Sequence, residues 1–261
     1  MVKLTIRSYH YLFVLVNMTS NLRCMPTDIW FNCALAVDVA LLTIRDQRLS
    51  VLLVNRSTAE PGQLALPGGF VLPGEDLPAA ALRELGEETS VQVDVRHLEQ
   101  LKTYGRPDRD FRGRVVSVAY LAVAANLPLP RYGTDAIGAS WYAVEPVLGS
   151  AGSLAFDHGE ILADAVERAR AKLEYTILAT AFCEADFTVA ELRRIYEIMW
   201  GTELDPRNFH RKITSTDFLE PTGQATTRDG GRPAALYRVR SDASGVMNPA
   251  LLRKPSSGEL P

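Results

Sequence analysis

The sequence predicts an α+β protein with two folded domains: a mixed sheet with helices over residues 31–173 and a winged helix-turn-helix over residues 174–240. Three observations predict this arrangement. Short Val- and Leu-rich segments alternate with two amphipathic helical segments, two helix start signals follow in close succession, and a hairpin pattern comes after them. With 47% hydrophobic and 23% charged residues, the 261 residues can bury two ordinary cores.

The first domain begins with a predicted β-hairpin. Cys33–Ile44 and Leu49–Val54 are rich in Val, Leu and Ala, and a turn at Asp46 and Gln47 separates them. Three more strand-like segments follow, at residues 91–95, 115–123 and 139–143. These segments predict a mixed sheet.

Two helices are predicted in the same domain. The first covers Leu77–Thr89. The second covers Phe156–Leu173, where apolar residues recur at helical spacing, and it can close the domain against its sheet.

Both ends of the chain are predicted to lie outside the folded domains. Residues 1–30 lack clear periodicity and are expected to form a peripheral arm, and residues 241–261, rich in Pro, Ser and Gly, a disordered tail. The apolar run Tyr11–Val16 is too short to cross a membrane, so we expect no membrane span and no signal peptide.

The cysteine content favours a reducing compartment. Cys24, Cys33 and Cys183 are an odd number without CxxC spacing, which predicts neither a disulfide framework nor a zinc site. We therefore expect a cytoplasmic protein. The four histidines are far apart in the sequence, and none is expected to be catalytic.

The first predicted helix has a cluster of carboxylates on one face. Glu84, Glu87 and Glu88 are spaced i, i+3 and i+4 and repel one another unless a cation neutralises them. A hard divalent cation such as Mg²⁺ prefers such ligands together with water and phosphate oxygens. Arg83 can orient Glu87, and Glu75 can support the site from further along the chain.

This segment resembles the Nudix box, in which a Gly, a Glu, an Arg-Glu pair and a Glu-Glu pair have fixed spacings. The resemblance implies a Nudix α/β/α sandwich in which Arg83, Glu84, Glu87 and Glu88 are catalytic if the protein is active. Backbone groups of Gly68 and Gly69 can then approach the cation or a pyrophosphate closely. The alternative interpretation is a solvated acidic face.

Two features of the box argue against efficient hydrolysis. Ser90 occupies the position of the last Gly, where the helix should end. Gly86 lies inside the helix and should cost about 1 kcal/mol relative to Ala. We expect weak or absent hydrolysis of ADP-ribose.

A charged loop over residues 104–114 is the predicted ligand-recognition segment. Arg106, Arg109 and Arg112 can hold a pyrophosphate by bidentate hydrogen bonds. Pro107 lies where Nudix proteins directed at ADP-ribose commonly have a proline, which is a further resemblance. The alternative is an ordinary solvated hairpin loop.

The second domain is predicted to be a helix-turn-helix with a wing. Thr188 and Glu191 form a capping box that opens one helix, and Asp205 with Pro206 opens the next. The second helix turns Phe209 and Ile213 inward. A hairpin around the loop that contains Arg232 follows and predicts the wing.

The distribution of charge favours DNA as the partner of this domain, although the whole chain has a formal net charge of -3. Residues 174–206 contain two basic and seven acidic residues, whereas residues 207–240 contain seven basic and three acidic residues. Such polarity turns the second helix and the wing toward a phosphate backbone. The predicted DNA contacts are Arg207, Asn208, Arg211, Lys212 and Arg232. The alternative is a helical appendage that binds protein or seals the first core.

The combination of the two domains resembles the NrtR family, the Nudix-related transcriptional regulators of NAD metabolism. The motifs are residues 208–212 of the second helix and residues 231–238 of the wing. The resemblance implies a homodimer that binds ADP-ribose or a related nucleotide and represses, or sometimes activates, genes of NAD biosynthesis from a double-stranded DNA operator. The alternative function is a Mg²⁺-dependent ADP-ribose pyrophosphatase with a structural C-terminal segment.

Overall fold

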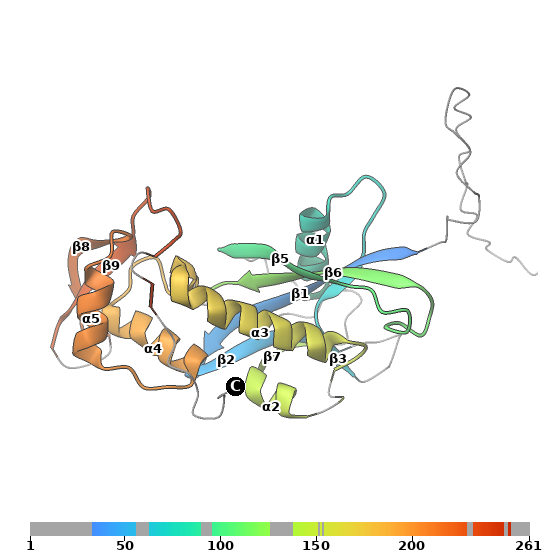
Figure 1. Cartoon of the computed structure of the whole chain (residues 1–261), viewed down its shortest axis with the longest axis horizontal. Helices are drawn as coiled ribbons and strands as arrows, with labels where there is room; N and C mark the ends of the chain where they lie inside the picture. Colours follow the sequence, from blue (N-terminus) through green and yellow to red (C-terminus); the bar gives the residue numbers. More distant parts are fainter. Residues whose placement is uncertain are drawn as a thin grey trace, which may run out of the picture. The chain divides into compact units, whose positions relative to one another are not determined.

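The computed structural model describes residues 33–55, 63–89, 96–125, 138–150, 152, 154–228, 232–247 and 250–251. Among these residues seven strands form one sheet (Figure 1): β1 (Ala34–Arg45), β2 (Arg48–Asn55), β3 (Leu64–Ala65), β4 (Gly68–Phe70), β5 (His97–Tyr104), β6 (Val115–Val123) and β7 (Gly138–Ala143). The predicted arm of residues 1–30, the strand at residues 91–95 and Ser90 lie outside the described residues.

The sheet is mixed, as predicted. β1 pairs with β2 antiparallel and with β6 parallel, and the strand order is β3-β2-β1-β6-β5. Asp46 and Gln47 have φ values of 47° and 58°, which match the two-residue hairpin turn that fits the twist of the strands. β5 was not predicted, because five of its eight residues are polar and only two are buried.

Helices cover both faces of the sheet, which confirms the α/β/α sandwich. α1 (Leu77–Thr89) has the predicted bounds and packs Ala80, Ala81 and Leu85 into a core on one face. α3 (His158–Tyr175) packs on the other face, where its apolar residues meet β1, β2 and β6. A short helix, α2 (Val144–Gly149), follows β7 directly.

The winged helix-turn-helix follows α3. Its elements are η2 (Ile177–Phe182), α4 (Val189–Trp200), α5 (Pro206–Thr214), β8 (Leu219–Thr226) and β9 (Ala234–Val239). The predicted caps are present: Thr188 and Glu191 form a capping box, and the Asp205 carboxylate accepts from the Asn208 amide at 2.7 Å. Gly201 ends α4 in the left-handed conformation, which lets α5 begin five residues later, at Pro206.

One apolar core joins this part to the sheet. Residues of α4 and α5, including Tyr196 and Phe209, belong to the same cluster of buried side chains as those of α3. Arg170 of α3 donates from Nε to the Met199 carbonyl at 2.8 Å, and Trp200 Nε1 donates to the Arg170 carbonyl at 3.2 Å. The domain boundary at residue 174 stays a prediction, since the described residues from Cys33 form one compact unit.

Part of the predicted disordered tail packs against α3. The Met247 amide donates to the Tyr175 carbonyl at 2.8 Å, and the Leu251 amide donates to the Glu174 carbonyl at 2.7 Å. Both side chains are buried. Two apolar residues in a polar segment therefore anchor it, which composition averaged over residues 241–261 does not predict. Residues 252–261 lie outside the described residues.

We predict that Gly86→Ala stabilises the protein by about 1 kcal/mol, because Gly86 lies inside α1 and an added Cβ meets no atom within 4 Å. Urea unfolding measures the change. Gly68→Ala is the contrasting variant: its Cβ would lie 2.3 Å from the Val37 carbonyl oxygen, so this variant should be destabilised. A loss of stability in Gly86→Ala would contradict the helical conformation at this residue.

Candidate functional site

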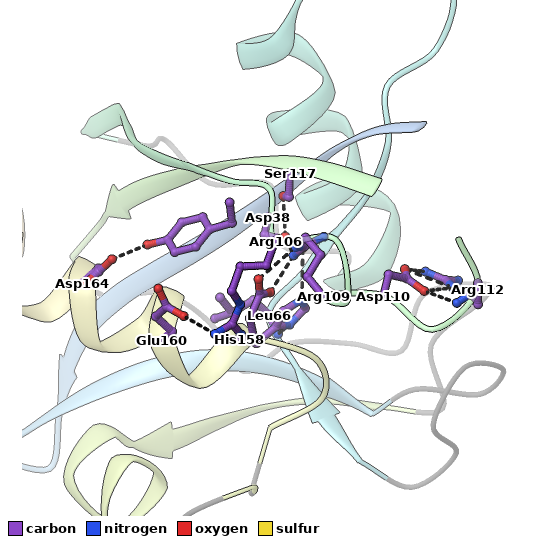
Figure 2. Close-up of polar contacts among 12 residues, drawn as sticks. Asp38, Leu66, Arg106, Arg109, Asp110, Arg112, Ser117, His158, Glu160 and Asp164 are labelled. Atoms are coloured by element: carbon purple, nitrogen blue, oxygen red, sulfur yellow. Dashed lines mark hydrogen bonds and ion pairs between the residues drawn. The ribbon is translucent and has the colours of Figure 1, made fainter. Parts of the chain in front are cut away.

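A buried cluster of charged residues joins the sheet, the charged loop and the start of α3. Arg109 of the loop donates from Nη2 to Asp157 Oδ1 at 2.7 Å and from Nε to Asp157 Oδ2 at 2.9 Å. The same Nη2 lies 3.3 Å from Oδ2 of Asp38 in β1. All three side chains are buried, and Figure 2 shows Arg109 extended toward Asp38. The bidentate geometry compensates for the cost of removing these charges from water.

His158 and Ser117 complete the hydrogen bonding of Asp38. The Leu66 amide donates to His158 Nδ1 at 2.9 Å, so Nδ1 is the acceptor and the ring proton lies on Nε2. That nitrogen is 3.3 Å from Asp38 Oδ1, and Ser117 Oγ donates to Asp38 Oδ2 at 2.5 Å. Burial raises the pKa of Asp38, but His158, Ser117 and Arg109 outweigh it and lower the pKa to about 2.

The three arginines of the predicted ligand loop have different surroundings. The sequence predicted that Arg109 can hold a pyrophosphate. In the structure its guanidinium is buried in the cluster and already bound by Asp157. Arg112 makes a bidentate ion pair with Asp110, apart from the buried cluster (Figure 2). Arg106 is exposed and lies 3.6 Å from Glu160. In this loop Arg109 and Asp110 are buried, whereas Arg106 and Arg112 are exposed.

Arg106 lines a cavity at the start of α3. The cavity has a volume of about 430 Å³, and its lining also includes Phe156, Glu160 and Leu154. This volume lies within the range of small-molecule sites. Of the three predicted arginines, Arg106 is the one that reaches this cavity.

Arg83 organises the carboxylate helix. Its guanidinium binds Glu75 at 2.7 Å, Glu84 at 2.8 Å and Glu87 at 3.1 Å. Arg83 also donates to the Phe70 carbonyl at 3.1 Å, which fixes the loop that precedes the helix. The hydrogen bond from Arg83, with one from the Leu72 amide, lowers the pKa of Glu75 to about 2. Arg83 therefore orients three carboxylates, and the sequence predicted one.

The three predicted metal ligands do not converge. Glu84 and Glu87 bind Arg83, while Glu88 accepts from the Gly68 amide at 3.0 Å. Among the described residues no three His, Cys, Asp or Glu side chains come together at a metal-binding distance. In this arrangement the carboxylates do not fit a divalent cation.

The glycines before α1 allow the loop to pack closely against its neighbours. A Cβ on Gly69 would lie 2.4 Å from the Glu84 carboxylate. Only a residue without a side chain lets this carboxylate approach the loop backbone. Gly68 and Gly69 thus bring the loop and the carboxylate helix together.

The second helix of the C-terminal part presents polar side chains to solvent. Phe209 and Ile213 are buried as predicted, whereas Arg207, Asn208, Arg211 and Lys212 are exposed. Arg211 Nη2 donates to Asn208 Oδ1 at 2.8 Å, so two of these side chains support each other. This face of α5 has the donors and acceptors that read base edges and phosphates.

The net positive charge of residues 207–240 overstates the number of basic side chains that are available to bind DNA. Arg228 makes a bidentate pair with Glu191, Arg238 binds Asp186 at 3.2 Å, and Arg240 binds Asp242. Arg228 and Arg238 attach the wing to the rest of the domain, whereas the pair of Arg240 with Asp242 is local. Arg232 of the wing is exposed, and with the outward residues of α5 it forms the candidate DNA-binding surface.

Sequence analysis missed the buried cluster around Asp38. A signal was present: Asp38 is an acid inside the otherwise apolar strand β1, and a charge buried in this way needs a partner. Its partners Arg109 and His158 are 71 and 120 residues away in the chain. Sequence spacing could not pair them.

The family models divide the chain in the same way as the sequence motifs. The NUDIX domain model matches residues 34–165, and the NrtR DNA-binding winged helix domain model matches residues 180–239. A relative from Acinetobacter baylyi, the ADPR responsive transcriptional repressor NtrR, is 34% identical over 228 residues, which cover 86% of this chain and 89% of the relative. The chain belongs to the NrtR family.

Solved structures agree with this assignment. The crystal structure of NrtR from Shewanella oneidensis, complexed with a 27mer DNA, has a TM-score of 0.71 and 32% identity, covering 85% of this chain and 99% of that one. An ADP-ribose pyrophosphatase from Methanocaldococcus jannaschii is 37% identical over 127 residues, 48% of this chain and 71% of that protein.

This NrtR family member has, in its described residues, no helix long and apolar enough to cross a membrane.

We predict that Arg109→Ala lowers the free energy of unfolding by about 3–5 kcal/mol, because it leaves Asp157 and Asp38 buried without their cation. Arg106→Ala is the matched control: the same loop loses an exposed arginine, and the change should stay within about 0.5 kcal/mol. Chemical denaturation of both variants measures the difference. Equal effects would contradict the structural role of Arg109.

Proposed function

We propose that this chain is a transcriptional repressor whose winged helix binds double-stranded operator DNA and whose Nudix domain binds ADP-ribose. The observation that supports this most is the exposed polar face of α5. The opposite side of the helix packs Phe209 and Ile213 into the core, and ion pairs fix the wing that follows. A helix that only sealed the first domain would have no need of this face. Two relatives support the proposal: one is an ADPR responsive transcriptional repressor, and the other was crystallised with a 27mer DNA.

The effector site is proposed at the loops around α1 and the start of α3. Arg106 is exposed at a cavity of ligand size, and Gly68 and Gly69 expose backbone close to the carboxylate helix. Arg112 and Glu75 border the same loops, and we include both among the proposed ligand-binding residues. Arg109 is assigned to positioning the loop, because its guanidinium is already bound by Asp157.

A homodimer that acts in the cytoplasm on genes of NAD biosynthesis completes the proposal. Repressors with a single recognition helix in each subunit read two half-sites about one helical turn apart, which requires a twofold dimer. The link to NAD genes follows from the family alone. Mg²⁺ enters only through the alternative function.

That alternative is a Mg²⁺-dependent ADP-ribose pyrophosphatase, favoured by Arg83, Glu84, Glu87 and Glu88 at the spacing of the Nudix box. We expect slow or absent turnover, because the carboxylates are held apart by Arg83 and the Gly68 amide. Product analysis with ADP-ribose and Mg²⁺ decides. Turnover on the order of 10 per second, abolished by Glu84→Gln, would favour the enzyme.

We predict that ADP-ribose and operator DNA change each other's affinity by the same factor. Linkage requires this equality for any two ligands that bind one protein at different sites. Fluorescence anisotropy on the promoter region of the chain's own gene, with and without ADP-ribose, gives one factor, and calorimetry with and without DNA gives the other. Absence of ADP-ribose binding at millimolar concentration would remove the effector from the proposal.

We predict that Arg211→Ala costs about 1–3 kcal/mol of DNA affinity and relaxes base specificity, because this exposed side chain can read base edges. Lys212→Ala and Arg232→Ala should lower affinity evenly across sequences and reduce the salt slope by about one each. Anisotropy titrations at two salt concentrations measure both quantities.

The control for these variants is Arg168→Ala, which removes the same charge from α3 outside the winged part. It should leave DNA binding unchanged. Should the three winged-helix variants bind as tightly as the parent protein, the DNA surface lies elsewhere and the assignment of α5 is wrong.

A further inference from the structure

Resting on the proposed function, we infer that Phe70, Phe111, Phe156 and Arg112 form a stacking surface for the flat purine base of the nucleotide effector. No residue of this group except Arg112 was selected from the sequence. The group unites three segments of the Nudix domain: the end of β4, the loop between β5 and β6, and the residues before α3.

The four side chains lie in contact as a set of flat groups. The rings of Phe111 and Phe156 are stacked, with centroids 6.4 Å apart and planes inclined by 20°. The Arg112 guanidinium lies 5.4 Å from the ring centroid of Phe156 and 5.7 Å from that of Phe70. Aromatic rings and guanidinium planes are the groups on which proteins stack nucleic-acid bases.

Two of these rings are exposed in a way that needs an explanation. Phe111 is 69% exposed and Phe70 is 46% exposed, although each could bury considerable apolar area. They are connected through Phe156 and Arg112 and are not scattered singly over the surface. A planar ligand would cover them.

Phe156 is held in an unfavourable backbone conformation. Its φ of 54° is rare for a bulky residue. Such a conformation costs free energy and persists only where the surrounding structure holds it in place. The surrounding is present on both sides, since the Ala155 amide donates to the Leu64 carbonyl at 2.8 Å and Asp157 is fixed by Arg109. Strain of this kind is typical of ligand sites.

Asp110 prepares Arg112 for stacking. The Arg112 guanidinium is bound in a bidentate manner by Asp110, with distances of 2.9 Å and 2.6 Å. The pair has no net charge, so it attracts a phosphate less than a free arginine would. Its orientation is fixed, and the guanidinium lies against the rings of Phe70 and Phe156 as part of the stacking surface. Arg112 is therefore assigned to the base and not to the pyrophosphate.

The stacking surface adjoins groups suited to the rest of a nucleotide. The Phe70 carbonyl accepts from Arg83, the centre of the carboxylate helix, and Gly69 precedes Phe70 directly. Phe156 also lines the cavity of about 430 Å³ together with Arg106. A ligand that joins a base to a charged diphosphate has partners for both parts here.

Calorimetry with ADP-ribose on the full chain tests this inference. Phe111→Ala should weaken ADP-ribose binding about 5- to 100-fold, the range measured when one aromatic stacking partner of a base is removed. Phe111→Trp should restore it, because a larger ring stacks at least as well. The control is Tyr175→Ala, which removes another exposed aromatic ring, from the far end of α3, and should bind normally.

The outcomes separate this inference from the proposed function. If the parent protein does not bind ADP-ribose, the proposed effector fails. If the parent protein binds and Phe111→Ala binds equally well, the stacking surface is wrong while the effector stands. Sedimentation of Phe111→Ala adds a second test: a change of oligomeric state would assign these rings to a contact between two copies and overturn the inference. DNA binding without effector reports that each variant is folded.

Discussion

The ion pair between Arg109 and Asp157 is the constraint on which the ligand side of the molecule depends. It connects a loop between two strands to the residue before α3, and through Asp38 it connects both to the central strand β1. Each partner alone would be a costly buried charge. The loop therefore has little freedom to move away from α3 while the sheet is folded.

α3 extends this constraint toward the winged helix. Its 18 residues span about 27 Å, with the ion cluster at the first turn and the hydrogen bonds to α4 near the last. The side chains between them lie in one core with α4 and α5. A ligand that shifts the loop by binding at the proposed site near Arg106 and Phe111 would have a rigid element through which it can bias α5, the proposed DNA-reading helix. This coupling fits a protein in which two binding events must influence each other.

Local patterns predicted most of the longer elements of the fold, and contacts between residues far apart in the sequence explain much of what these patterns could not predict. The β1 hairpin, α1 and the caps of α4 and α5 depend on residues within a few positions of one another, which spacing reveals. The structural role of Arg109 depends on its ion pair with Asp157, which is 48 residues away in the chain. The sequence therefore predicted a pyrophosphate-binding arginine where the structure has a buried arginine that holds the loop in place. For the same reason the sequence could not predict that Phe111 stacks on Phe156 or that Met247 packs against α3.

The central claim, that one cooperative unit contains both the ligand loop and the DNA-reading helix, can be tested with tryptophan fluorescence. Trp141 lies in β7 and Trp200 in α4, so two variants that each retain one of them, with Trp30 replaced, report on each part separately. Urea unfolding should give coincident midpoints, and adding Arg109→Ala should lower both by the same amount. If Arg109→Ala lowers the Trp141 midpoint and leaves the Trp200 midpoint unchanged, the two parts unfold independently and the claim is wrong.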